Sequence, residues 1–206
     1  MPKILPNQYN YCCRFFIGNN TTCFNNLIAV FFAFVGLLLF IGSTFNARAS
    51  HGLAMDIAYT CLGPDTYEIE LNFYRDCGGS PAPLNIQIDA TPISCPGANS
   101  FKIPLKLATT TEVSALCPAY IAQSTCNGGS YDGIEQYQYK GLVTFEQACA
   151  QWQLFYNLCC RSFEVTNLQN PGDQDINATA IINNANGLCN SSPKFTYLPF
   201  AYLCGN

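Results

Sequence analysis

Cysteine is the residue type with the most chemistry to offer in this chain of 206 residues, which has thirteen cysteines and one histidine, His51. An even number of cysteines in an exported chain predicts a framework of disulfide bonds. Zinc is the alternative, but no C-x-x-C pair occurs and one histidine adds little to a ligand set. We therefore predict structural disulfides, with the pairing left open, among the ten cysteines after residue 50. These are Cys61, Cys77, Cys95, Cys117, Cys126, Cys149, Cys159, Cys160, Cys189 and Cys204.

Two of these cysteines, Cys159 and Cys160, are neighbours in the stretch NLCCRSF, residues 157–163. Successive residues of a strand point to opposite faces of the sheet. Cys160 shares its parity with Trp152 and should face the core, whereas Cys159 should face outward. We therefore predict two separate disulfides, one between sheets and one to a covering loop. A bond between the two neighbours, or a bulge that reverses the parity, is the alternative.

Other residues have side chains that take part in catalysis elsewhere, but their types and positions argue against it here. A nucleophilic serine or cysteine needs a neighbouring base, and His51 lies close to the expected start of the mature chain. Glycoside hydrolysis needs two opposed carboxylates, whereas Glu68 and Glu70 would share one solvent-facing side of a strand. We therefore predict no catalytic residues, no cofactor and no enzymatic activity.

Two pairs of charged residues are candidates for binding or structural roles. Asp173 and Asp175 follow a Pro-Gly turn and are a weak candidate for Ca²⁺, which takes oxygen ligands that often cluster in turns. No further acidic residues have useful spacing there, so a plain turn is favoured and no metal site is predicted. Arg75 and Asp76 end an expected strand, where a half-buried ion pair would fix the corner by bidentate hydrogen bonds.

Period-two alternation of apolar and polar residues indicates the strands that must position these side chains. From Tyr67 to Phe73 the odd-numbered residues are apolar and should face the core, while Glu68, Glu70 and Asn72 should face away. Turn-forming residues separate the windows, which predicts an all-β fold: an antiparallel immunoglobulin-like β-sandwich stapled by disulfides. The windows are residues 57–59, 67–73, 84–88, 101–107, 137–145, 152–158 and 176–180.

The first 49 residues differ from the rest in charge and hydropathy. They hold three basic residues and no acidic ones, whereas the remaining chain has six basic and thirteen acidic residues, a net charge of −7. Residues 27–41 form a 15-residue apolar run, short for a membrane span, and residues 47–49 match a signal-peptidase site. We therefore predict a leader over residues 1–49 with a signal helix, cut after Ala49, and a β-sandwich domain over residues 50–188.

An uncut apolar run would instead tether the protein, and only this leader would then contact a membrane. The sequence has no cluster of Lys or Arg able to neutralise several phosphates, which argues against nucleic acid as a partner. Together with the disulfide prediction, the leader predicts that the mature protein is secreted or lies on the outer cell surface.

Several stretches resemble the N-terminal region of large cell-surface proteins of gliding Bacteroidota. They are SHGLAMDIAYTCLG (50–63), TYEIELNFYRDCGG (66–79), WQLFYNLCCRSFEVTNLQNPG (152–172) and LCNSSPKFTYLPFAYLCGN (188–206). The resemblance therefore covers residues 50–206 in one order. Two departures affect local contacts: Met55 and Asp56 stand where the family often has Gly-Glu, and Ser162 stands where it usually has Asn.

The resemblance implies a much longer protein. Such relatives continue into immunoglobulin-like or cadherin-like repeats and often end in a gliding-motility-associated domain read by the type IX secretion system. Residues 189–206 would then be the truncated start of a following β-repeat. The function implied is that of a non-enzymatic extracellular module for adhesion or gliding motility, with a surface protein or glycan as partner.

The sequence also supports an alternative, a carbohydrate-binding accessory domain of a secreted polysaccharide-active protein. Four tyrosines fall in loops or irregular runs among small polar residues, where exposed aromatic rings suit contact with protein or glycan. They are Tyr120, Tyr131, Tyr197 and Tyr202. A third interpretation is an envelope protein tethered by the uncut apolar run.

Overall fold

The computed structural model describes residues 51–163 and 165–195, which contain seven strands and four short 3₁₀ helices. The strands are β1 (Gly52–Gly63), β2 (Thr66–Asp76), β3 (Asn85–Pro92), β4 (Phe101–Glu112), β5 (Ile134–Thr144), β6 (Trp152–Cys159) and β7 (Asp175–Ile182). The helices are η2 (Pro118–Gln123), η3 (Thr125–Asn127), η4 (Pro171–Asp173) and η5 (Ala185–Gly187). The predicted leader and its signal helix lie outside the described residues.

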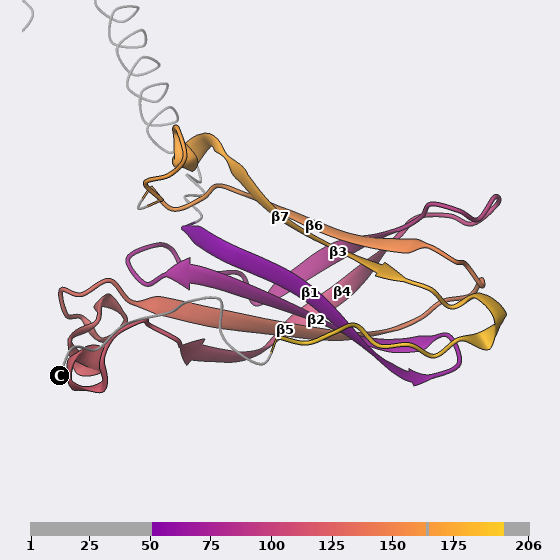
Figure 1. Cartoon of the computed structure of the whole chain (residues 1–206), viewed down its shortest axis with the longest axis horizontal. Helices are drawn as coiled ribbons and strands as arrows, with labels where there is room; N and C mark the ends of the chain where they lie inside the picture. The colour runs from indigo at the N-terminus through magenta and orange to yellow at the C-terminus, as the bar shows by residue number, and fades with distance from the viewer. Residues whose placement is uncertain (1–50, 164, 196–206) are drawn as a thin grey trace, which may run out of the picture. The chain divides into compact units, whose positions relative to one another are not determined.

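The seven strands form one continuous sheet in the order β1-β2-β5-β4-β3-β6-β7, and every neighbouring pair is antiparallel (Figure 1). The sheet curls far enough that its edge strands β1 and β7 come into contact. Across this seam the Tyr59 hydroxyl donates a hydrogen bond of 2.8 Å to the Ile181 carbonyl. The described strands therefore approach a closed, barrel-like arrangement.

This continuity differs from the two separate sheets that a sandwich would have. The reason lies in the hairpin of β3 and β4, whose pairing runs from Asn85 opposite Lys106 to Ala90 opposite Phe101. Because β4 also pairs with β5 and β3 also pairs with β6, this hairpin links the two halves of the sheet without a break.

The inward faces of the strands follow the predicted parity. Each predicted window overlaps a strand, so the alternation located all seven correctly. Fully buried side chains of that parity include Tyr67, Ile69, Leu71, Ile88, Ile103, Leu105, Tyr139 and Leu154. Each large apolar side chain buried in this way contributes about 1.5–3 kcal/mol. Leu84 is the exception, because it precedes β3 and is 70% exposed.

The described cysteines form disulfide bonds, as predicted, and three of these bonds join residues that are far apart in the sequence. The described bonds are Cys61–Cys189, Cys77–Cys126, Cys95–Cys149 and Cys159–Cys160. Cys117 is also disulfide-bonded, and Cys204 lies outside the described residues.

The prediction of separate bonds for Cys159 and Cys160 is wrong, because the two bond to each other. The parity argument held only while the strand continued, and β6 ends at Cys159. Cys160 lies beyond the strand, so the alternation of β6 does not predict the direction of its side chain.

The segment that follows Cys189 is attached to the outer edge of β1. Besides the disulfide to Cys61, the Ser192 hydroxyl accepts from the Tyr59 N–H at 2.9 Å, and the Ser192 N–H donates to the Tyr59 carbonyl at 2.9 Å. The Ser191 hydroxyl accepts from the Cys61 N–H at 3.0 Å. Residues 189–195, predicted to begin a following repeat, are therefore bonded to this sheet, and residues 196–206 lie outside the described part.

Replacing Cys61 and Cys189 together by alanine should lower the free energy of unfolding by about 4 kcal/mol, because this bond closes a long loop in the unfolded chain. The two cysteines are 128 positions apart. Denaturant unfolding of the oxidised proteins measures the loss. The matched control is the double change Cys159→Ala and Cys160→Ala, which opens no loop because its residues are adjacent. Equal losses in the two variants would contradict the loop-closure account.

Candidate functional site

Arg75 anchors one end of β2 and is only 5% exposed. Its Nη2 donates to Oε2 of Glu135 on β5 at 2.8 Å, and its Nη1 donates to the carbonyls of Asp76 and Gly79 at 2.9 and 2.7 Å. The guanidinium carbon lies 5.4 Å from the centre of the Tyr137 ring, and the hydroxyl of Tyr137 donates to the same Glu135 oxygen at 3.0 Å. Arg75 thus joins β2, β5 and the loop after β2.

The predicted ion pair between Arg75 and Asp76 is wrong, because each charged group has another partner. Adjacent strand residues face opposite sides of a sheet, so the two side chains diverge. Oδ2 of Asp76 instead lies 3.1 Å from Nδ1 of His51, at ion-pair distance but without hydrogen-bond geometry. The Asp76 N–H also donates to the His51 carbonyl at 3.1 Å. Position 79 requires glycine here, because a Cβ on Gly79 would overlap the His51 ring.

A pocket of about 380 Å³ opens beside His51 and Arg75. Its walls are mainly apolar and include Phe73, Pro81, Pro83, Ile86, Tyr156 and Leu158. Cys159, half of the disulfide between neighbours, also lines it. Because the guanidinium of Arg75 is already paired with Glu135, the pocket offers chiefly apolar surface.

A second arrangement, here named the polar strip, lies on the outward face of β1, β2 and β5. Its residues are Asp56, Glu70, Asn72, Tyr74, Gln136, Gln138 and Lys140. The pairing of β1 with β2 sets Asp56 opposite Asn72, and the pairing of β2 with β5 sets Asn72 opposite Gln138. Strand register therefore gathers carboxylate, amide and ammonium groups from three strands on one face.

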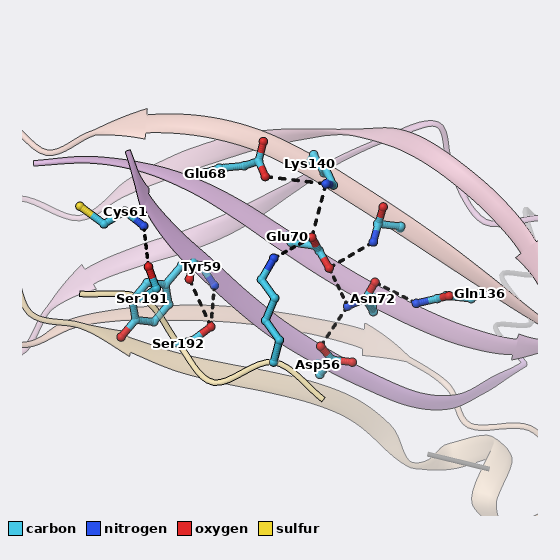
Figure 2. A network of polar contacts seen from close by, with 12 residues as sticks. Asp56, Tyr59, Cys61, Glu68, Glu70, Asn72, Gln136, Lys140, Ser191 and Ser192 are labelled. Atoms are coloured by element: carbon cyan, nitrogen blue, oxygen red, sulfur yellow. Dashed lines mark hydrogen bonds and ion pairs between the residues drawn. The ribbon is translucent and has the colours of Figure 1, made fainter. Parts of the chain in front are cut away.

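Asn72 is the centre of the polar strip (Figure 2). Its Nδ2 donates to Oδ1 of Asp56 at 3.1 Å and to Oε1 of Glu70 at 3.3 Å. Its Oδ1 accepts from Nε2 of Gln136 at 3.0 Å. Nε2 of Gln138 also donates to Oε1 of Glu70, at 3.1 Å. The amide of Asn72 is thereby satisfied within the strip, as a buried polar group requires.

The charges of the strip are unevenly paired. Oε2 of Glu70 lies 3.5 Å from Nζ of Lys140 and 3.5 Å from Nζ of Lys194. Lys140 also lies 3.7 Å from Oε2 of Glu68 (Figure 2). Asp56 has no ion pair with any of the described residues. Within the described part of the chain, Glu70 therefore has two cationic neighbours and Asp56 has none.

The pKa values of the two carboxyl groups shift in opposite directions. Burial chiefly raises the pKa of Asp56, and the charge of Glu70 adds to the rise, against the hydrogen bond from Asn72. Burial also acts to raise the pKa of Glu70, but the hydrogen bond from Asn72 and the charges of Lys194 and Lys140 outweigh it and lower that pKa. Asp56 is therefore the less compensated of the two carboxylates.

The C-terminal segment turns the polar strip into a groove of about 250 Å³. After the bonds to β1, Pro193, Lys194 and Phe195 continue past the strip and line this groove. They cover an outward face that the alternation alone would leave to solvent, and Glu70 and Asn72 are only 9% and 8% exposed. The name "groove" below refers to this hollow.

The two aspartates considered for calcium have other roles. Asp173 ends η4, and Asp175 begins β7, where its Oδ2 accepts from Nδ2 of Asn157 on β6 at 2.9 Å. Among the described residues, no group of three or more His, Cys, Asp or Glu side chains is gathered in a way that could hold a metal ion. Asp175 thus makes a cross-strand hydrogen bond.

Sequence reasoning missed the groove. It treated the outward residues of β2, Glu70 and Asn72 among them, as an ordinary solvent face. The sequence did contain a sign of a polar cluster, because Gln136 and Gln138 are two more amides at outward positions of the strand that became β5. Nothing in the alternation, however, shows that the segment containing Lys194 returns to cover them.

An exposed aromatic pair lies on the connection between β4 and β5. The rings of Tyr120 and Tyr131 have centroids 5.4 Å apart and are tilted by 60°. The two residues are 47% and 42% exposed. The disulfide of Cys77 with Cys126 ties this connection to the end of β2. Two of the four predicted loop tyrosines are thus brought together, and the other two lie outside the described residues.

Comparison of the chain with protein-family models, curated proteins and solved structures finds no match. Within residues 51–163 and 165–195, no helix has both the length and the apolar character needed to cross a bilayer. The apolar run at 27–41 lies outside that part. Function is therefore inferred from the residues and the geometry described above.

Replacing Arg75 by methionine should lower the free energy of unfolding by about 3 kcal/mol, because Glu135 would keep a partly buried charge without its partner. Thermal or denaturant unfolding measures the change. Lys102→Met is the matched control, since Lys102 and its partner Asp89 have side chains 58% and 48% exposed. An exposed pair contributes about 0–1 kcal/mol. Similar losses in both variants would show that Arg75 is not an anchor.

Proposed function

We propose that the chain is a non-enzymatic extracellular module of a bacterial cell-surface protein. The disulfide framework is the observation that supports this most strongly, since three described bonds join residues 49, 54 and 128 positions apart. Such bonds persist in oxidising environments and are rare in the cytosol. A predicted leader that directs export agrees with the same location.

The strand order matches the topology of immunoglobulin-like domains. A constant-type immunoglobulin domain has strands A, B, E and D in one sheet and C, F and G in the other. The order β1-β2-β5-β4-β3-β6-β7 reads A-B-E-D-C-F-G when the strands are lettered along the chain. We propose that this sheet is such a sandwich with its two sheets joined through the hairpin of β3 and β4.

The role that we propose is adhesion or gliding motility, in which the module offers a contact surface to a surface protein or glycan. Rigid covalent cross-links suit a domain that transmits force between a cell and a surface. The resemblance of residues 50–206 to N-terminal regions of gliding Bacteroidota proteins supports this role, as does a groove built of polar side chains held by their neighbours.

Intact cells that make the full-length protein should expose it to antibody, and deletion of the gene should reduce attachment or colony spreading severalfold. Restoring the gene is the control. N-terminal sequencing of the exported protein should begin at Ser50, whereas an uncut terminus would favour the membrane-tethered alternative. A cytoplasmic protein with eight or more free thiols would refute the proposal.

A second candidate function is carbohydrate binding within a secreted polysaccharide-active protein. The exposed pair of Tyr120 and Tyr131 favours it, because aromatic rings among small polar residues suit contact with protein or glycan. The disulfide between Cys77 and Cys126 would hold this pair on a fixed support.

A glycan array tests the second candidate with the exported protein. Changing Tyr120 and Tyr131 together to alanine should reduce retention on the preferred glycan at least tenfold, because the stacking surface would be lost. Leu84→Ala is the matched control, since Leu84 is also exposed but lies far along the chain from this pair. Equal retention by both variants, or no retained glycan, would exclude this function for the aromatic pair.

A further inference from the structure

The orientation of every amide in the polar strip is fixed by the two carboxylates. Asn72 must direct its Nδ2 toward Asp56 and Glu70, because an amide oxygen there would face two acceptors. Its Oδ1 then faces Gln136, which must present Nε2. Gln138 must likewise present Nε2 to Oε1 of Glu70.

The amide oxygens that remain are acceptors, and the second N–H of Gln138 remains as a donor. Oε1 of Gln136, Oε1 of Gln138 and Oδ2 of Asp56 have no hydrogen-bond partner among the described residues. None of these three oxygen atoms is fully buried without a partner, so solvent reaches each of them. All three residues line the groove. The groove therefore offers acceptors to a ligand, and one of them belongs to a carboxylate.

The charged residues of the groove also favour a positively charged ligand. Among the residues that line the groove, Asp56 and Glu70 are acidic and Lys194 is basic. The excess of one negative charge falls on Asp56, the carboxylate without a cationic neighbour in the described residues. A ligand that fits must therefore bring a positive charge and several hydrogen-bond donors.

A primary ammonium group meets both requirements, since it has three donors, no acceptor and one positive charge. The groove already contains one, because Nζ of Lys194 lies 3.5 Å from Oε2 of Glu70. A calcium ion is a poorer match, because it takes six to eight oxygen ligands. A volume of about 250 Å³ has room for the side chain of a second lysine.

We propose that the groove binds the side chain of a lysine from a partner protein, with its ammonium group on Asp56 and the carbonyl oxygens of Gln136 and Gln138 nearby. This inference rests on the proposed role as a binding module and names the chemistry of its partner. Asp56 is the specificity-determining residue, and Lys194 is an internal competitor that holds the neighbouring carboxylate.

The test is a titration of the exported, oxidised protein with Nα-acetyl-lysine N-methylamide, followed by NMR of the side-chain amides of Gln136 and Gln138. These signals should shift and saturate. The same compound acetylated on Nε should bind at least tenfold more weakly, because it has lost its charge. Glucosamine oligomers form a further arm, and binding of these oligomers without the lysine compound would overturn the choice of a protein partner.

Two variants should move the affinity in opposite directions. Asp56→Asn should weaken binding at least tenfold without lowering the unfolding midpoint, because the asparagine can still accept from Asn72. Lys194→Met should strengthen binding severalfold, because it removes the competing ammonium group. Asp89→Asn, at an exposed acid on β3 that pairs with Lys102, should change nothing.

Lowering the pH should also weaken binding of the lysine compound, because it removes the negative charge of Asp56. The ammonium group stays charged, while Asp56 takes up a proton as the pH falls through its raised pKa. Unchanged affinity in Asp56→Asn, equal binding of the acetylated compound, or no binding at all would each overturn the inference. Because the titration uses purified protein, its failure is distinct from a failure to find the protein on the cell surface.

Discussion

The burial of β2 on both faces is the constraint on which the rest of the described structure depends. Its inward residues, such as Ile69 and Leu71, make ordinary apolar contacts, but its outward residues Glu70 and Asn72 are almost as well buried. Polar groups removed from water must find hydrogen-bond partners within the protein. Everything on the outward face follows from this need, including the direction in which each amide points.

The strand meets this need in two ways along its length. At Arg75 the solution is a single buried cation that uses Glu135 and the carbonyls of Asp76 and Gly79. At Asn72 the solution is a neutral amide between two carboxylates, and it leaves Asp56 uncompensated. The raised pKa of Asp56 means that folding binds protons there, so stability falls as the pH rises through that pKa.

The sequence predicted the strands well because alternation is a local property. The inward set of β2 could be read from the seven successive residues 67–73, and the same holds for β6 over residues 152–158. The pair Cys159 and Cys160 was misread because parity has meaning only inside a strand, and β6 ends there. Arg75 was assigned the wrong partner because Glu135, distant in sequence, lies opposite it in the register of β2 and β5.

The groove could not be predicted because it depends on one disulfide pairing among many, and connectivity cannot be deduced from sequence alone. The bond between Cys61 and Cys189, together with the hydrogen bonds of Ser191 and Ser192, holds the following residues along β1, so that Lys194 reaches Glu70. Without it, the pairing of β1 with β2 would still hold Asp56 against Asn72, but one wall would be lost. A wall fixed by a covalent bond does not have to be ordered when a ligand arrives, which lowers the entropic cost of binding. The bond between Cys61 and Cys189 is therefore both a cross-link of the fold and the support of one wall of the groove.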